Sequence, residues 1–414
     1  MSFFIALRSS EKLIMSQLSM KQSVNDLAIF GGKPLFTPPI STSNLVRPNF
    51  SRFLGYSRTM YEQHIYTNNG PLLKKLEQRL AEFHGTQFCR VLANGFWALV
   101  LCIKTLALPG RTEVIMPSLT YRRLADVVAW AGLKPCFCEV DAKTLAIDPE
   151  HVRQLIGAET ALILAAHPIV NTCDAPMLED VAAEQNIPLL FDSVESVYET
   201  IGGKKVGGFG SAECFSMHAS KLINGFEGGY ITTNDEILAQ QIAMMRGFGF
   251  HGHDNIEMLG LNAKLSEVHA AMALAALDDL EDQIDRNRQR YRCYQELLAR
   301  IPSLRLLPFD EKEKTSFKNI VVEILSDWPL DRELTLEILN REGALVRAYY
   351  SPALHTRAME YPHVPTVLPL TERLSKLFML LPCGHLVKIS DIKTFIALLE
   401  FIADHAVAIK ERLA

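Results

Sequence analysis

Between residues 71 and 191, short apolar runs alternate with stretches of helical spacing, and this alternation is what most limits the possible folds. The apolar runs lack polar residues at every second position, which is typical of parallel strands covered by helices on both faces. The pattern therefore predicts an α/β fold with a mostly parallel central sheet flanked by helices. The expected strands are Glu113–Met116, Pro135–Val140, Ala161–Ala165 and Leu189–Phe191, and the expected helices are Pro71–His84, Leu124–Trp130, Glu150–Leu155 and Met177–Gln185.

The alternation stops after residue 191, and the rest of the chain has a different organisation. Two more strand-like runs enclose a glycine-rich loop, and a helical stretch and a long charged helix follow: Cys214–Met217, Tyr230–Thr233, Glu236–Arg246 and Ser266–Arg300. The first 49 residues are rich in Pro and Gly, which interrupt regular structure. We therefore expect an N-terminal arm at 1–49, a large domain at 50–290 and a smaller C-terminal α+β domain at 291–414.

The composition argues against several classes of protein. The 414 residues carry a formal net charge of −5 with Lys and Arg scattered along the chain, so no nucleic-acid partner is expected. No apolar stretch is long enough to span a membrane, and the N-terminus lacks the features of a secretory signal, which together predict a cytoplasmic protein. None of the eight cysteines forms a Cys-x-x-Cys pair, so we expect free thiols and no metal site.

Two residues in the middle of the chain indicate the chemistry. Lys221 lies in a polar, glycine-flanked loop between two apolar runs, within the segment FSMHASKLINGFEGGYITTND. A lysine that forms a Schiff base must be positioned and partly desolvated so that its amine can be neutral. Asp192 ends a predicted parallel strand, where ligands of α/β sheets bind and where a carboxylate could pair with a protonated pyridine nitrogen. Alone, these residues are typical of a surface lysine and a helix cap; together they indicate pyridoxal 5'-phosphate (PLP) as the cofactor.

Several motifs recur in the order and spacing of one enzyme family. They include FGG (Phe30–Gly32), PSLTY (Pro117–Tyr121), KKVGGFGSAECFSMHASK, GLNAKLSEVHAA (Gly260–Ala271) and YYSPALH (Tyr349–His355). From about Gly31 to the C-terminal lobe, the sequence resembles the DegT/DnrJ/EryC1/StrS family of PLP-dependent sugar aminotransferases. This resemblance implies the type I fold of PLP-dependent transferases, which is the fold of aspartate aminotransferase.

The resemblance also implies roles for matching positions. Lys221 matches the lysine that carries the cofactor as a Schiff base and then moves the proton, and Asp192 matches the partner of the pyridine nitrogen. The other cofactor-binding positions are Ser216 and the backbone of Gly95 and Phe96 at the phosphate, Tyr121 stacked on the ring, and Asn262 reaching the phosphate of a neighbouring subunit. The last role requires a homodimer with its active sites at the subunit interface.

The sequence departs from the family beside the cofactor. The phosphate loop reads Asn94-Gly95-Phe96-Trp97 where Ser-Gly-Thr is usual, and Trp97 either packs on its helix or lies near the cofactor. Glu195 stands where the family has Gln or His in contact with the cofactor phenolate. A second carboxylate there should repel the phenolate unless it is protonated or points elsewhere.

Three further residues are candidates for the substrate end of the site. In the family, the region around Tyr350 and His355 lines the substrate. Arg122, next to Tyr121, could bind a carboxylate or phosphate of the substrate, or it could lie with Arg123 on a solvated helix face. His218 precedes the lysine by three residues, and a structural role is favoured for it.

The expected reaction moves an amino group from an amino acid, L-glutamate, to a keto-sugar through pyridoxamine 5'-phosphate. A nucleotide-linked 4-keto-6-deoxysugar fits the branch that the motifs resemble; a cyclitol or another non-nucleotide ketone, or a catalytically silent PLP-binding regulator, is the alternative. A sugar dehydratase of this fold would carry His in place of Lys221. A dinucleotide-dependent oxidoreductase would carry a Gly-x-Gly-x-x-Gly motif after its first strand, and none is found there.

Overall fold

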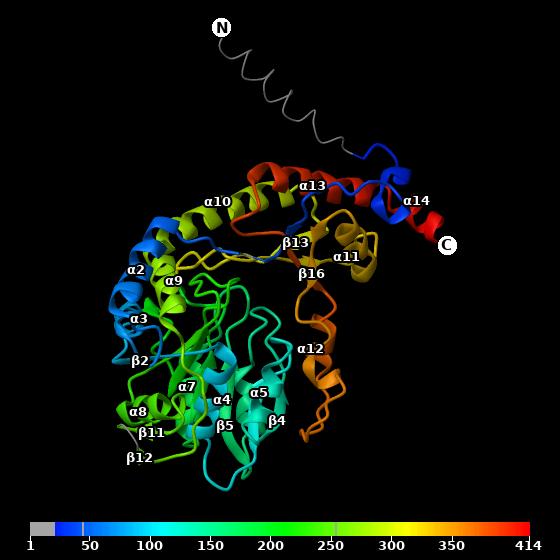
Figure 1. Ribbon diagram of the computed structural model, residues 1–414. Helices are drawn as coiled ribbons and strands as arrows, with labels where there is room; N and C mark the ends of the chain where they lie inside the picture. Colours follow the sequence, from blue (N-terminus) through cyan, green and yellow to red (C-terminus); the bar gives the residue numbers. More distant parts are fainter. Residues whose placement is uncertain (1–20, 44, 253–254) are drawn as a thin grey trace.

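The computed structural model describes residues 21–43, 45–252 and 255–414. At its centre lies a seven-stranded sheet with the strand order β2-β10-β9-β6-β5-β3-β4 (Figure 1). Strand β10 is antiparallel to both of its neighbours, and the remaining six strands are parallel to one another. The predicted α/β fold with a mostly parallel sheet is therefore confirmed. The strands are β2 (Phe88–Leu92), β3 (Glu113–Pro117), β4 (Lys134–Cys138), β5 (Thr160–Ala166), β6 (Leu189–Asp192), β9 (Ala212–Ser216) and β10 (Gly229–Thr233).

Helices cover both faces of this sheet, as the uninterrupted apolar runs require. Val114 and Leu162 contribute to a core on one face, and their neighbours Ile115 and Ile163 contribute to a separate core on the other. Successive strand residues point to opposite faces, so each strand needs an apolar side chain at every position. The helices in this part of the chain are α3 (Pro71–His84), α4 (Gly95–Leu106), α5 (Leu124–Trp130), α6 (Pro149–Leu155), α7 (Ala175–Glu184) and α8 (Glu236–Met245).

The structure differs from the expected elements in two places. Strand β2 has no counterpart among the expected strands; Arg90 lies in its middle, and the guanidinium donates to the carbonyl of Ala239 at 3.2 Å. The single helix expected over Ser266–Arg300 is two helices, α9 (Glu267–Asp278) and α10 (Leu280–Leu298). They meet at Asp279, whose carboxylate accepts a hydrogen bond from the Asn49 amide at 2.5 Å. Helix α9 therefore ends at the point where the chain contacts Asn49, the residue before α2.

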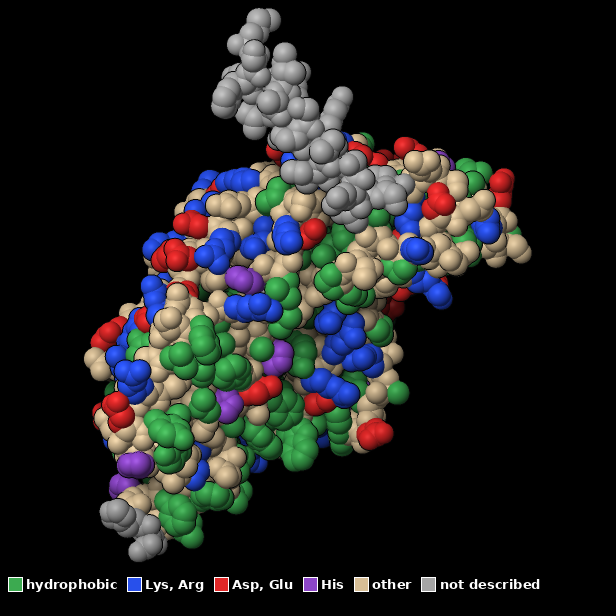
Figure 2. Space-filling model, turned by 45° about the horizontal axis from the view of Figure 1, so that its top comes forward, with side chains coloured by type: hydrophobic (Ala, Val, Ile, Leu, Met, Phe, Trp, Pro, Cys, Tyr) green, Lys and Arg blue, Asp and Glu red, His purple; other side chains and the backbone are tan. Residues whose placement is uncertain are grey.

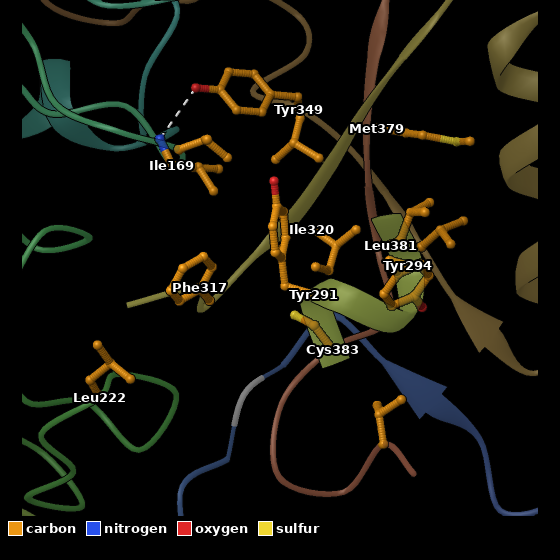
Figure 3. Packing of buried hydrophobic residues seen from close by; sticks show 14 of the residues in the cluster. Ile169, Leu222, Tyr291, Tyr294, Phe317, Ile320, Tyr349, Met379, Leu381 and Cys383 are labelled. Atoms are coloured by element: carbon orange, nitrogen blue, oxygen red, sulfur yellow. Dashed lines mark hydrogen bonds between the residues drawn. The ribbon is translucent and has the colours of Figure 1, made fainter. Parts of the chain in front are cut away.

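A second, antiparallel sheet lies in the C-terminal part, in the strand order β13-β14-β17-β16. Figure 1 shows α10 and α13 side by side next to it. Figure 3 shows how tyrosines of α10 pack with the apolar residues around β14 and β17. The elements are β13 (Leu304–Leu306), β14 (Ile320–Ile324), β16 (Arg347–Ala348), β17 (Phe378–Leu381), α11 (Arg332–Arg341), α12 (Pro369–Leu374), α13 (Ile389–Asp404) and α14 (Ala406–Leu413). The domain limits at 50–290 and 291–414 stay predictions.

The described part of the arm is attached to this C-terminal part. Strand β1 (Ile40–Ser41) pairs in parallel with β15 (Ala344–Leu345). The buried carboxylate of Glu342 forms an ion pair with Lys21 at 2.9 Å and accepts the amides of Ala28 and Leu35. Residues 1–20 of the predicted arm lie outside the described residues. The remaining elements are α2 (Phe50–Gln63), the short turns Val24–Asp26, Ala28–Phe30 and Leu354–Thr356, the pair β7 (Thr200–Ile201) and β8 (Lys204–Lys205), and the pair β11 (Phe250–His251) and β12 (Asn255–Ile256). Within the described ranges, no helix combines the length and apolar character needed to cross a membrane.

Candidate active site

The candidate site lies along one edge of the seven-stranded sheet. Because β2, β3, β6 and β9 are parallel, their carboxyl ends meet at this edge, which is where α/β sheets bind ligands. The residues that follow or end these strands are Gly95, Tyr121, Asp192 and Ser216. The sheet thus places four of the predicted cofactor-binding positions on the same side of the molecule.

Asp192 is a buried carboxylate with little hydrogen bonding. Only 4% of its surface is exposed, and its side chain accepts one hydrogen bond, from the Val194 amide at 3.3 Å. Burial raises the pKa of Asp192 to about 6, against the smaller opposing effect of Lys221. A carboxylate in this state is stabilised by a cationic partner, as the assigned role beside a pyridinium nitrogen requires.

The start of α4 forms a small anion site together with the end of β9. Asn94 caps the helix by accepting the amide of Trp97 at 2.9 Å. The amides of Gly95 and Phe96 have no partner among the described residues. A β-carbon on Gly95 would lie 3.1 Å from the Phe215 carbonyl and 3.2 Å from the Ser216 side chain. Free amides at a helix N-terminus beside a hydroxyl suit a phosphate.

Lys221 lies in an ordered loop rather than a loose one. Its amide donates to the His218 carbonyl at 2.8 Å, and the Asn224 side chain joins the loop to the Val46 carbonyl at 2.7 Å. The side chain of Lys221 is 18% exposed, and its amine contacts a carboxylate oxygen of Glu195. The His218 ring, by contrast, is half-exposed and bonds to Ser220. The lysine is thus positioned and partly desolvated, as the sequence predicts.

Glu195 has a second cationic partner that sequence reasoning missed. The amine of Lys318 lies 2.6 Å from the other carboxylate oxygen, and Asn319 approaches the same oxygen at 3.4 Å. Burial raises the pKa of Glu195, but Lys221 and Lys318 outweigh burial and hold it well below its usual range. Glu195 is therefore an ionised carboxylate that faces two lysines. Its expected repulsion of the cofactor phenolate is not avoided by protonation of Glu195.

The proposed substrate residues Tyr350 and His355 differ in their surroundings. Tyr350 packs on Tyr349 with ring centroids 4.8 Å apart and has a left-handed backbone, with φ of +41°. A bulky residue with positive φ is uncommon and frequently found at functional sites. His355 instead has both ring nitrogens at protein partners, Ser118 at 2.6 Å and Glu372 at 3.3 Å. Its contacts are those of a residue that holds the loop in place.

A pocket of about 750 Å³ lies beside Tyr121 in the chain, between the start of α5 and the loop that follows His355. Arg357 reaches across it and donates to the Arg122 carbonyl at 3.0 Å. Arg123 pairs with Asp126, whereas the guanidinium of Arg122 has no ion-pair partner in the described part of the chain. The lining residues are Arg122, Arg123, Ala125, Asp126, Ala129, Trp130, Leu354, Arg357, Ala358, Met359, Glu360 and Tyr361.

The remaining candidates are Tyr121, Asn262 and Trp97. The first two have exposed side chains, and the third packs against an exposed one. Tyr121, in the loop between β3 and α5, is 51% exposed, so its ring is accessible for stacking. Asn262 is exposed and its backbone pairs with Gly247, and among the described residues its side chain has no hydrogen-bond partner. Trp97 packs edge-on against Trp130 at 5.9 Å, which supports the packing interpretation of this residue.

The comparisons with known proteins agree with this geometry. Residues 51–400 match the model of the DegT/DnrJ/EryC1/StrS aminotransferase family. The chain belongs to this family and is an aminotransferase, and the predicted type I fold is confirmed. The structure of DesI, determined in the presence of its TDP-sugar product, superposes with a TM-score of 0.87 at 33% identity, covering 94% of this chain and 99% of DesI.

Relatives of known activity act on different ketones. The dTDP-4-amino-4,6-dideoxy-D-glucose transaminase of Shigella dysenteriae is 29% identical over 322 residues, covering 78% of this chain and 86% of that enzyme. The L-glutamine:2-deoxy-scyllo-inosose aminotransferase of Streptomyces fradiae is 29% identical over 283 residues, covering 64% and 66%. Relatives at the same level of identity thus differ in the acceptors that their names give.

Proposed function

We propose that this protein transfers an amino group from an amino acid, L-glutamate, to a nucleotide-linked 4-keto-6-deoxysugar, with PLP as its cofactor. The observation that carries the proposal is the joint placement of Lys221, Asp192 and the anion site of α4 at one sheet edge. The similarity to the transaminase of Shigella dysenteriae and to DesI supports the class of acceptor.

The residues of the site fit PLP. The amides of Gly95 and Phe96 and the hydroxyl of Ser216 would hold the phosphate, and Asp192 would pair with the ring nitrogen. The half-exposed ring of Tyr121 would stack on the cofactor, and Lys221 would carry it as a Schiff base. Bound PLP supplies a carbonyl carbon that takes up the amino group and a ring that withdraws electrons.

The chain's own residues position the reactants and move the proton. With PLP bound, the freed amine of Lys221 would take the proton from the α-carbon of the amino acid and give it to the cofactor carbon bonded to the transferred nitrogen. Asp192 keeps a positive charge on the ring nitrogen because a buried carboxylate is stabilised by a cation. The same two residues serve the return half of the reaction with the keto-sugar.

The pocket beside α5 supports an anionic, nucleotide-linked acceptor. Its volume of about 750 Å³ is in the range of small-molecule sites. Arg122 and Arg357 offer planar donors that suit a diphosphate, and Trp130 offers a ring that is 66% exposed to stack on a base. Tyr350 would contact the sugar between this pocket and Lys221, and His355 would orient the loop.

We also propose a homodimer in the cytoplasm. Exposed apolar side chains of α2, of the lysine loop and of the β11–β12 pair, among them Phe50, Phe226 and Phe250, offer a surface for a second subunit. Figure 2 shows apolar side chains exposed in groups over the lower part of the molecule. Asn262 would then complete the phosphate site of the partner. A cytoplasmic location follows from the nucleotide-linked substrate.

The test uses the pyridoxamine form of the enzyme, prepared with glutamate and offered three acceptors. We expect thymidine-diphosphate-linked 4-keto-6-deoxyglucose to discharge the cofactor at least tenfold faster than the free keto-sugar or a keto-inositol. Equal rates with the keto-inositol would favour a cyclitol, which the similarity to the Streptomyces fradiae enzyme makes the second candidate. No conversion by glutamate or another amino acid would indicate a silent PLP-binding regulator.

A further inference from the structure

Glu195 is a buried carboxylate shared by two lysines from distant parts of the chain. One oxygen contacts the amine of Lys221 in the lysine loop, and the other lies 2.6 Å from the amine of Lys318, just before β14. The side chains of Glu195, Lys221 and Lys318 are 13%, 18% and 6% exposed. Buried charges persist only when they are paired, so the three groups have to be considered together.

The position of Lys318 is fixed by its neighbours. The Ser316 hydroxyl donates to the buried carboxylate of Glu199 at 2.6 Å. Phe317 packs against Tyr291 with ring centroids 5.2 Å apart, in the core that Figure 3 shows together with Leu222, the residue after Lys221. Both lysines therefore extend toward Glu195 from segments whose apolar residues belong to one core. The backbone that carries Lys318 is therefore held beside Glu195 by the packing and hydrogen bonds of its neighbours.

Within this cluster, two lysine amines share the one carboxylate of Glu195. When the amine of Lys221 is joined to the cofactor, Glu195 and Lys318 remain as a neutral pair next to the linking nitrogen. An unpaired Glu195 at this position would hold a proton on that nitrogen, and an unpaired Lys318 would expel it.

We propose that Lys318 is a positioning residue that neutralises Glu195 and thereby sets how readily the nitrogen of Lys221 takes up and releases its proton in the loaded enzyme. This inference rests on the proposed function, since it concerns Lys221 joined to PLP. It also explains how a second carboxylate is accommodated beside the cofactor phenolate: the ion pair with Lys318 neutralises the charge of Glu195.

The other titratable groups that face the cluster are Asp192, Tyr349, Tyr350 and Cys383. Burial raises the pKa of Cys383 to about 11, and it raises those of both tyrosines, so these three groups stay neutral near pH 7. Asp192, with its pKa raised by burial to about 6, is ionised above that pH. Burial lowers the pKa of Lys318, and its ion pair with Glu195 opposes this effect, so a substitution at either residue unbalances the pair.

The experiment compares PLP-loaded wild type with Lys318→Met, Glu195→Gln and the double variant. Visible absorbance is followed against pH, since the band changes when the nitrogen joining Lys221 to the cofactor loses its proton. We expect Lys318→Met to raise the midpoint by about 1 pH unit and Glu195→Gln to lower it by a similar amount. The double variant should return close to wild type. Lys314→Met, which removes an exposed lysine of the same segment, should leave the midpoint unchanged.

Shifts of the two single variants in the same direction, or an unmoved midpoint in Lys318→Met, would overturn the proposal. If Lys318→Met does not fold, Lys318→Gln carries the same expectation, and Lys318→Arg, which keeps the charge, should retain the wild-type midpoint. A wild-type protein without any visible band overturns the proposed function and this inference with it. If wild type shows the visible band but its pH midpoint is the same in Lys318→Met, only this inference is overturned.

Discussion

The proposed cofactor end and the proposed substrate end of the site are held in place in different ways. At the cofactor end, Asp192 and Ser216 are the last residues of neighbouring parallel strands, and Gly229 of β10 lies opposite both Ser216 and Leu92 in register. At the proposed substrate end, the exposed Arg122 and the half-buried Arg357 line a pocket from segments that share no strand. Sheet hydrogen bonds fix the first arrangement, whereas the second depends on two loops.

This difference explains how one family serves several acceptors. A site whose groups are set by strand register keeps its geometry while loops change, because loops tolerate substitution better than a sheet does. The relatives that act on a dTDP-sugar and on an inosose are both 29% identical to this chain. We therefore expect changes at the cofactor end to reduce turnover with every substrate, and changes at the substrate end to alter the choice of acceptor.

Among the variants that test the difference between the two ends of the site, Asp192→Asn should have the largest effect on turnover. The amide cannot balance a positive charge on the ring nitrogen, so kcat should fall roughly 10²–10³-fold while PLP still binds. Single-turnover absorbance measurements with glutamate, and then with the keto-sugar, should give a similar loss in both half-reactions. A variant with near-normal rates in either half would contradict the role given to Asp192.

Removing the same carboxylate should also change stability in the absence of cofactor. Burial raises the pKa of Asp192 from 3.8 to about 6, so the folded protein binds a proton that the unfolded chain releases between these values. The stability contributed by this group is therefore present below about pH 4 and is lost as pH rises through 6, by an amount of about 3 kcal/mol.

We expect the melting temperature of cofactor-free wild type to fall relative to that of Asp192→Asn between pH 4 and 7. Differential scanning fluorimetry of both proteins measures this difference. Loading with PLP should reduce it, because the ring nitrogen supplies the missing cation. If the difference in melting temperature between the two proteins does not change with pH, the pKa of Asp192 is not raised in the folded protein.

A smaller and more selective effect is expected at the substrate end. Arg122→Ala and Arg357→Ala should each raise KM for the nucleotide-linked keto-sugar roughly tenfold, which corresponds to the loss of a charge-assisted hydrogen bond. The half-reaction with glutamate should not change. Arg123→Ala is the matched control, because Arg123 is already paired with Asp126 at 2.9 Å. Equal losses in both half-reactions would show that the two ends are not separate.

The sequence reveals the cofactor end more readily than the substrate end. Lys221 and Asp192 stand out because each belongs to a local pattern, an apolar run followed by a polar loop, whereas the role of Ser216 is implied by the family resemblance. The ion pair of Glu195 with Lys318 spans 123 positions in the chain, and nothing local to either residue indicates the other. The same holds for Arg357 and Arg122, which are 235 positions apart.

Two errors in the fold have a similar cause. The break between α9 and α10 depends on a contact of Asp279 with the residues that lead into α2, and helical spacing continues through it in the sequence. Strand β2 was missed because Arg90 lies in its middle and uses its guanidinium to reach the Ala239 carbonyl near α8. In both cases a long-range contact decides what local periodicity leaves open.

The most direct test of the account is to locate the lysine that binds PLP. The protein is incubated with PLP, reduced with borohydride and digested, and the modified peptide is identified by mass spectrometry. We predict a single modified residue, Lys221, with Lys318 unmodified although both amines contact Glu195. Modification of Lys318, or of no lysine at all, would contradict the account.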